Sequence, residues 1–140
     1  MRTHRPYSRV IERLRSVGLR PTRQRLALMR HLFDGALRHV TAEQLHGEAL
    51  AAGVAVSLAT IYNTLHQLNR AGLLREVVVE PGRSYFDTNV SDHHHFYFEE
   101  SGRLLDIPGD RVRVSELPAA PAGTTVKRVD VVVRVVSEQK

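Results

Sequence analysis

Apolar residues recur every three or four positions through the first half of the chain, and polar residues and glycines separate the apolar runs. This spacing is typical of amphipathic helices that bury one face. It predicts four helices, at residues 7–18, 22–35, 41–53 and 57–72. Serine or threonine begins the last three segments and glycine ends them, as expected for helix caps. The third segment also places a glutamine three residues after its threonine, which is the spacing of a capping box.

The pattern changes at residue 73, where the helical period ends. Residues 73–88, LLREVVVEPGRSYFDT, predict two strands joined by a turn at Pro81 and Gly82. Helices followed by a hairpin have the element order of a winged helix-turn-helix domain. The third and fourth predicted helices would form the helix-turn-helix unit, and the hairpin would form the wing.

The last third of the chain predicts a second, smaller domain. Residues 96–107 predict a hairpin that turns at Ser101 and Gly102, and residues 117–125 form a connector rich in proline and alanine. Residues 126–136 predict a long strand rich in valine. One small hairpin and one strand cannot bury this apolar surface alone, so we expect the sheet to complete itself in a homodimer.

These elements predict an α+β fold: an N-terminal winged helix-turn-helix domain, residues 1–88, followed by a small C-terminal α/β dimerisation domain, residues 89–140. The chain has no cysteine, which excludes disulfides, cysteine-based zinc sites and thiol nucleophiles. No apolar run approaches the roughly 20 residues that span a bilayer, and no signal sequence stands at the start. We therefore expect a cytoplasmic protein that does not bind a membrane.

The net charge of +5 is unevenly distributed along the chain. Residues 1–90 hold 13 lysines and arginines against 7 acids, whereas residues 91–140 hold 7 against 8. The excess is densest between Arg2 and Arg30, where nine arginines accompany a single acid, Glu12. Because arginine favours bidentate contacts with phosphate, this distribution indicates nucleic-acid binding. The alternative, an ordinary charged helix face, would usually mix both signs.

The fourth predicted helix is the expected recognition helix. Ser57 and Thr60, near its start, can donate hydrogen bonds to phosphate. Tyr62 can pack its ring on a thymine methyl, with a place in the core as the alternative, and Asn63 has the donor and acceptor that match adenine. Arginines complete the expected interface: Arg20 in the minor groove, and Arg23, Arg25 and Arg83 at phosphates.

Three consecutive histidines run into a strand-like aromatic stretch. Alternate residues of a strand share a face, so His93 and His95 could bind one ion while His94 points away. Imidazole and carboxylate ligands without thiolate suit Fe²⁺, Mn²⁺ or Zn²⁺. The alternative is a solvated loop rich in imidazole. The remaining isolated histidines are expected to be ordinary surface or hydrogen-bonded residues: His4, His31, His46 and His66.

Five stretches carry a resemblance to a known family: GLRPTRQR, HVTAEQL, VSLATIYNTLHQLNRAGLLRE, SYFDT and DHHHFYF. Together they make nearly the whole chain resemble the ferric uptake regulator superfamily, with the nearest likeness to its iron response regulator branch. The resemblance implies a dimeric, iron- or haem-responsive transcriptional regulator, a repressor or an activator, without catalytic activity. It would bind a palindromic operator in double-stranded DNA and control genes of iron and haem homeostasis.

The resemblance also implies a divalent-metal site at the hinge between the two domains. Its ligands would be His39, Asp87, His93, His95 and Asp106. An ion held by residues of both domains would fix the DNA-binding domain against the dimerisation domain, which is a mechanism for sensing. Two departures stand out: the family's Cys-x-x-Cys reads Phe98 and Ser101 here, and the helix after LLDI is cut to DRVRVSEL.

Haem is a second cofactor that the resemblance to the iron response regulators implies, with His93, His94 and His95 as candidate axial ligands. The same likeness implies a haem-biosynthesis enzyme as a protein partner. Most relatives carry an arginine where this chain has Asn63, so the expected operator is richer in A/T pairs.

Other functions compete with iron sensing. The same fold and ligands suit a manganese- or zinc-responsive regulator, or a peroxide-responsive one. A His/Asp metallohydrolase would need an open coordination position and a general base, and it would leave the arginine-rich first half unexplained. A further alternative is a winged-helix module that acts only through protein contacts.

Overall fold

The computed structural model of the chain describes residues 6–139, in two compact units of which one ends at Val90 and the other begins at Ser91. The sequence pattern placed this boundary after residue 88. Arg2 and His4 lie outside the described residues. Within the described chain, no helix combines the length and the apolar character needed to cross a membrane.

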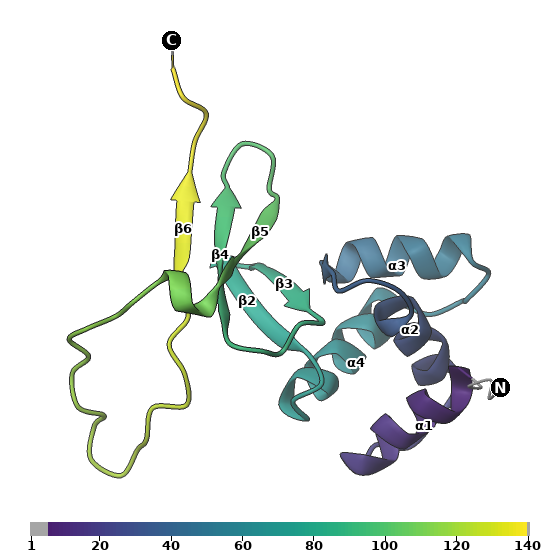
Figure 1. Ribbon diagram of the computed structural model, residues 1–140. Coiled ribbons are helices and arrows are strands. Elements are labelled where there is room, and N and C mark those ends of the chain that lie inside the picture. The colour runs from purple at the N-terminus through teal and green to yellow at the C-terminus, as the bar shows by residue number, and fades with distance from the viewer. Residues whose placement is uncertain (1–5, 140) are drawn as a thin grey trace, which may run out of the picture. The chain divides into compact units, whose positions relative to one another are not determined.

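Four helices form most of the first unit, as the apolar spacing predicts (Figure 1). They are α1 (Pro6–Ser16), α2 (Arg23–Phe33), α3 (Ala42–Ala51) and α4 (Leu58–Arg70). The three predicted caps are confirmed, because a side-chain oxygen accepts a hydrogen bond from the first turn at Thr22, Thr41 and Ser57. At α3 the side chain of Gln44 also accepts from the Thr41 N–H at 2.9 Å, which completes the predicted capping box.

The inward faces of these helices meet in one apolar core. Each helix contributes fully buried leucines, among them Leu14, Leu28, Leu45 and Leu65. Burying one such side chain contributes about 1.5–3 kcal/mol, so many of them together hold the four helices in a fixed arrangement. The core therefore determines which face of α4 remains exposed.

The predicted wing is confirmed by β2 (Arg75–Glu80) and β3 (Arg83–Asp87), which pair in antiparallel fashion. The chain reverses at Pro81 and Gly82, where the glycine has a φ of 75°. A residue with a side chain rarely adopts that φ, so glycine is the natural choice in this tight turn.

A third strand, β1 (His39–Val40), pairs with β3 on the side away from β2, giving the order β1-β3-β2. Two residues are too short to show an alternating pattern, and the sequence did not predict this strand. Its register sets His39 opposite Asp87 and Val40 opposite Phe86. Val40 and Phe86 belong to the helical core, so His39 and Asp87 lie on the other face of the sheet.

The second unit is a three-stranded sheet in the order β5-β4-β6 (Figure 1). Strands β4 (His93–Phe98) and β5 (Leu104–Pro108) form the predicted hairpin, which turns through Ser101 and Gly102. Strand β6 (Val132–Val135) pairs with β4 in parallel, an arrangement that requires a crossover connection.

The strand predicted over residues 126–136 is shorter in the structure, where β6 contains only Val132–Val135. Just before β6, the N–H of Val131 donates to a side chain, Nδ1 of His94, rather than to a strand carbonyl. The crossover from β5 to β6 contains a single helical turn, η1 (Gly109–Arg111), within the described residues. The helix expected over DRVRVSEL, residues 110–117, is shorter still in the structure, because residues 112–117 form no helix.

Candidate metal centre and nucleic-acid interface

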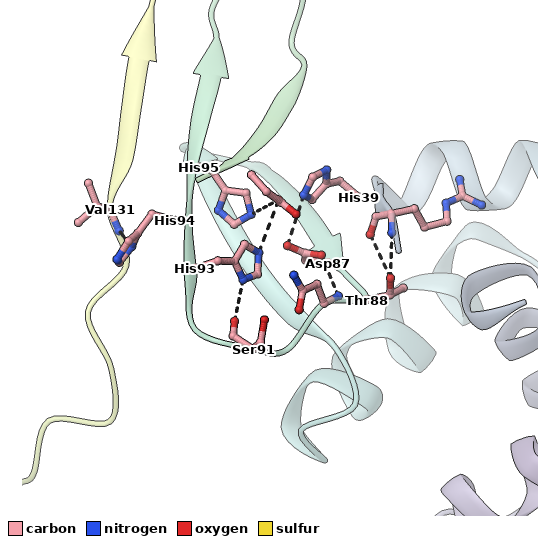
Figure 2. Close-up of polar contacts among 11 residues, drawn as sticks. His39, Asp87, Thr88, Ser91, His93, His94, His95 and Val131 are labelled. Atoms are coloured by element: carbon pink, nitrogen blue, oxygen red, sulfur yellow. Dashed lines mark hydrogen bonds and ion pairs between the residues drawn. The ribbon is translucent and has the colours of Figure 1, made fainter. Parts of the chain in front are cut away.

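Two histidines and an aspartate of the second unit form a cluster with the character of a metal site. His93 and His95 are buried on the same face of β4, and Asp106 on β5 stands directly opposite His95. The Oδ1 atom of Asp106 lies 3.6 Å from Nε2 of His93 and 3.4 Å from Nε2 of His95. The predicted sharing of one strand face by His93 and His95 is therefore confirmed (Figure 2).

These separations fit ligands of a common ion. Two donor atoms that each lie about 2.1 Å from one metal are roughly 3.0–3.5 Å apart, depending on the angle between them. The imidazole rings of His93 and His95 have centroids 4.6 Å apart, so their Nε2 atoms approach the same region. One donor atom from each of His93, His95 and Asp106 lies within 4.8 Å of the others.

A backbone carbonyl orients the ring of His93. Its Nδ1 atom lies 2.6 Å from the carbonyl oxygen of Ser91 (Figure 2). Because a carbonyl only accepts hydrogen bonds, Nδ1 carries the proton and donates it. In the neutral ring this leaves the lone pair on Nε2, the atom that faces Asp106. This arrangement is the usual second contact of a metal-binding histidine.

The first unit contributes a separate pair of candidate ligands. Nε2 of His39 on β1 lies 3.4 Å from Oδ2 of Asp87 on β3, and the carboxylate is almost wholly buried. The other oxygen of Asp87 accepts a hydrogen bond from the N–H of Asn89 at 2.9 Å. On its other side Asp87 stands opposite Arg75 of β2, which is also buried. The five predicted ligands thus form two groups, one within each unit.

Contacts around Arg38 hold His39 on the sheet. The backbone N–H of Arg38 donates to Oγ1 of Thr88 at 2.9 Å, and the Thr88 N–H donates to the Arg38 carbonyl at 3.1 Å. The guanidinium of Arg38 makes two hydrogen bonds, of 2.9 and 2.6 Å, to the carboxylate of Glu48 on α3. The hydrogen bond from Arg38 lowers the pKa of Glu48 below its ordinary range.

His94 has a different role from its neighbours. Its side chain lies on the opposite face of β4, and Nδ1 accepts a hydrogen bond of 3.1 Å from the N–H of Val131 (Figure 2). This bond ties the start of β6 to β4. In the neutral ring this leaves the proton on Nε2, so His94 has no free lone pair for haem iron while this bond is kept.

The exposed face of α4 carries the residues expected to read DNA. Ile61, Leu65 and Leu68 are buried in the core, whereas Asn63 is exposed and Tyr62 is 37% exposed. Tyr62 is therefore a surface residue, and the core alternative is wrong. The helical period of the sequence distinguishes the surface position of Tyr62 from the core alternative, because it already assigns the inward face to Ile61 and Leu65.

The two predicted phosphate donors at the start of α4 are engaged with each other. Oγ of Ser57 accepts from the N–H of Thr60 at 3.1 Å and donates its proton to Oγ1 of Thr60 at 3.0 Å. A hydroxyl has one proton, so in this arrangement only Thr60 keeps a hydroxyl donor for a phosphate.

The predicted arginine contacts lie on different parts of the first unit. Arg20 and Arg23 are exposed around the start of α2, and Arg83 is exposed on the wing, 3.9 Å from Glu80. Arg25 differs, because its guanidinium donates to Oε1 of Gln67 on α4 and to the Arg20 carbonyl, both at 2.8 Å. Arg25 thus joins α2 to the recognition helix.

Two of the isolated histidines of the first unit, His46 and His66, make local contacts, as expected. Nε2 of His46 on α3 lies 3.1 Å from the carbonyl oxygen of Val56. His66 on α4 packs between two rings, with centroids 6.3 Å from that of Tyr62 and 5.7 Å from that of Phe86. The hydroxyl of Tyr62 donates to Oε2 of Glu43 at 2.8 Å, a contact that the sequence analysis did not predict.

Comparison with known proteins identifies the family. A sequence model described as the ferric uptake regulator family matches residues 16–134. The peroxide-responsive repressor PerR of Staphylococcus epidermidis is 34% identical over 97 residues, which cover 69% of this chain. The same match covers 64% of that relative, so the chain spans slightly less than two thirds of its length.

Two solved structures share the fold. The ferric uptake regulator from Pseudomonas aeruginosa with manganese has a TM-score of 0.70 and 22% identity, covering 93% of this chain and 98% of its own. The ferric uptake regulator of Vibrio cholerae has a TM-score of 0.70 and 19% identity, with coverage of 91% and 98%. At these identities the similarity concerns the fold alone.

Proposed function

Because the chain belongs to the ferric uptake regulator family, we propose that it is a metal-responsive transcriptional regulator that binds operator DNA as a homodimer. The observation that carries the proposal is the pair His93 and His95, buried on one strand face with both Nε2 atoms close to Asp106. Buried imidazoles beside a carboxylate are the donor set of a metal site, and they lie in the unit that does not contain the recognition helix.

A single divalent ion would bind both groups of ligands, His39 and Asp87 together with His93, His95 and Asp106. Nitrogen and oxygen donors without sulfur suit Fe²⁺, Mn²⁺ or Zn²⁺. The ion supplies positive charge and a fixed coordination geometry. Because the ligands come from both units, binding would favour one arrangement of the first unit relative to the second. Only some arrangements suit two half-sites of a palindromic operator, so metal binding controls DNA affinity.

The first unit supplies the DNA contacts. Tyr62 and Asn63 are exposed on α4, and arginines at positions 20, 23 and 83 lie on the surface of the same unit. We assign Asn63 to an adenine and the arginines to the sugar–phosphate backbone, with Arg20 in the minor groove. An operator richer in A/T pairs follows from asparagine at position 63.

The second unit supplies the dimer interface. An apolar groove of about 430 Å³ lies on its sheet and is lined mainly by Phe96, Phe98, Leu105 and Val135. Leu105 and the neighbouring Val136 are 46% and 67% exposed. A second copy of the chain would remove this surface from water, and a two-fold axis would match a palindromic site.

Iron or haem is the proposed signal, and genes of iron and haem homeostasis are the proposed targets. Likeness to the iron response regulators remains the basis for haem. The peroxide-responsive relative favours a second candidate, in which the same site responds to peroxide through bound iron. Manganese and zinc are further candidates for the bound ion, since imidazole and carboxylate donors suit both.

The deciding experiment measures DNA binding in defined ligand states. The purified protein, freed of metal, would select duplexes from a random library after addition of Mn²⁺, Fe²⁺, Zn²⁺ or haem, at a stated salt concentration. Enrichment of one palindrome in a metal-dependent manner is the expected result. Exposure of the Fe²⁺ and Mn²⁺ forms to hydrogen peroxide separates the candidates, because loss of binding only in the iron form indicates peroxide sensing. Absence of any enriched duplex, with hydrolysis of ester substrates by the metal-loaded protein, would instead support the metallohydrolase.

A further inference from the structure

The hydroxyl of Tyr62 is held by a carboxylate from another helix. It donates a hydrogen bond of 2.8 Å to Oε2 of Glu43, which lies in the first turn of α3. We propose that Glu43 is a positioning residue that fixes the ring of Tyr62 for contact with a thymine methyl group. The inference rests on the proposed function, because it assigns a role within the same DNA-reading surface.

The local structure holds Glu43 at the start of α3. Thr41 and Gln44 form the capping box that begins α3, and Glu43 follows the cap by two residues. A helix N-terminus carries a partial positive charge, which attracts the negative side chain of an acid in the first turn. The charged acceptor in turn strengthens the hydrogen bond from Tyr62, and it raises the pKa of the tyrosine hydroxyl.

The ring of Tyr62 is also supported by its own helix. His66, one turn further along α4, stacks on it with an interplanar angle of 19°. The edge of His66 in turn contacts Phe86, which is fully buried in the core. Tyr62 is thus restrained at its hydroxyl by Glu43 and on one ring face by His66, while more than a third of it stays exposed.

Without the carboxylate, the ring has space to move. A cavity of about 490 Å³ lies between α4 and the wing, and its lining includes Glu43, Tyr62, His66 and Arg83. A free ring could turn into this space and would lose rotamer freedom on binding DNA. Ordering a side chain before association lowers that cost, which is the reason for a positioning contact.

The charge of Glu43 gives the proposal a distinctive signature. A carboxylate near DNA repels phosphates, so its removal should raise affinity for any sequence while reducing discrimination between bases. An ordinary DNA contact would behave differently, because its loss lowers affinity and discrimination together. Substitution of a residue needed only for folding would change neither the affinity nor the discrimination of the protein that remains folded.

The experiment compares thymine with uracil, which differ by one methyl group. A duplex selected by the Mn²⁺-loaded wild-type protein would be resynthesised with uracil at each thymine in turn. At the position read by Tyr62 the wild type should bind the uracil duplex about fourfold more weakly, as expected for one buried methyl group. Tyr62→Ala should abolish this difference.

Four variants and one control then test Glu43 itself. Glu43→Ala and Tyr62→Phe should each reduce the thymine–uracil difference towards onefold, and the double variant should lose no more than either single variant. Glu43→Gln should restore most of the difference, because the amide oxygen still accepts from the tyrosine hydroxyl. Both Glu43 variants should bind unselected DNA more tightly. Glu12→Ala, which removes an exposed acid from α1, is the matched charge control and should keep the full difference.

The outcomes distinguish failure of the positioning role of Glu43 from failure of the DNA-reading function. If Glu43→Ala keeps the full thymine–uracil difference while Tyr62→Ala loses it, the DNA-reading function stands and the positioning role of Glu43 is wrong. If no duplex is selected, or if Tyr62→Ala keeps the difference, the assignment of Tyr62 to a base is wrong and the inference fails with it. Circular dichroism and thermal unfolding of each variant confirm that the folded protein is being compared.

Discussion

Nε2 of His39 lies 3.4 Å from Oδ2 of Asp87, and the register of β1 on β3 sets that separation. The strand that places His39 is only two residues long, so its position depends on contacts outside the ladder. Arg38 provides them through Thr88 on one side and Glu48 on the other. The position of His39, a candidate ligand, thus depends on its neighbour Arg38, which forms a salt bridge to α3, the helix that precedes the recognition helix.

Replacing single histidines should separate ligands from structural residues. His95→Ala should weaken binding of Mn²⁺ or Zn²⁺ by at least tenfold, because it removes a buried donor that faces Asp106. His94→Ala is the matched control, and it should largely spare the metal because that ring faces Val131. Isothermal titration calorimetry with each ion measures the metal affinity of both variants.

Haem should rank the same variants differently if it binds at His94. A Soret-band titration of His94→Ala and His95→Ala measures this directly. A weaker haem complex for His94→Ala alone would place haem on the opposite face of β4 from the metal cluster. Equal, small effects of both substitutions on metal and haem would contradict the sensing role of the histidine stretch.

Local signals account for the parts of the fold that were predicted. Thr22, Thr41 and Ser57 each carry their own hydroxyl acceptor, so the start of a helix can be identified without knowing what it packs against. The alternation of His93 and His95 is equally local, because a strand points every second side chain to the same face.

Contacts between distant residues account for most of what was missed. β1 exists only because β3 stands beside it, and two residues contain no period of their own. Just before the short β6, Val131 donates to His94, a contact that no pattern in residues 126–136 reveals. The bond between Glu43 and Tyr62 joins two helices, and either residue alone is an ordinary exposed side chain in the sequence. Strand spacing predicted His93 and His95 as ligands, whereas His39, Asp87 and Asp106 came from family resemblance.

Loss of the Arg38–Glu48 salt bridge should lower stability in a pH-dependent manner. The pKa of Glu48 is lowered in the folded state by its hydrogen bond to Arg38, so the stabilisation is present above the unfolded-state pKa of about 4.3. It is lost as the pH falls through the lower folded-state value. Glu48→Gln should therefore cost about 0.5–1 kcal/mol at pH 7, a modest value because both side chains are partly exposed.

Urea unfolding of the wild type and Glu48→Gln at pH 7 and at pH 3 measures this difference. The gap between the two proteins should narrow at the lower pH. Glu12→Gln serves as the control, since Glu12 is an exposed acid on another helix. A gap that is the same at both pH values would show that the cost arises from packing rather than from the ion pair.

Two glycines should respond in opposite ways to alanine. A Cβ atom on Gly109 would lie 2.7 Å from the backbone oxygen of Asp92, just before β4, and backbone cannot move aside cheaply. Gly109→Ala should therefore destabilise the second unit by about 1–3 kcal/mol. Gly47, inside α3, has open space around it and should gain up to about 1 kcal/mol on the same change.

Hydrogen exchange measured by mass spectrometry localises both effects. Peptides from β4 should exchange faster in Gly109→Ala, and peptides from α3 should exchange more slowly in Gly47→Ala. Unchanged exchange in β4 would mean that η1 can shift away from Asp92 without loss of the strand.

Base reading and phosphate contact predict different responses at Asn63 and Arg23. Asn63 is exposed on α4, and its amide matches the N6 and N7 atoms of adenine, so Asn63→Ala should lose about 1–3 kcal/mol of discrimination at one adenine per half-site. Binding to unrelated DNA should stay the same. Arg23→Ala should instead weaken binding to every sequence and reduce the slope of log affinity against log salt by about one. Fluorescence anisotropy with the selected duplex, a single-adenine variant and a scrambled duplex at several salt concentrations distinguishes the two. If Asn63→Ala weakened all three duplexes equally, Asn63 would contact the backbone, and the expected preference for A/T pairs would lose its basis.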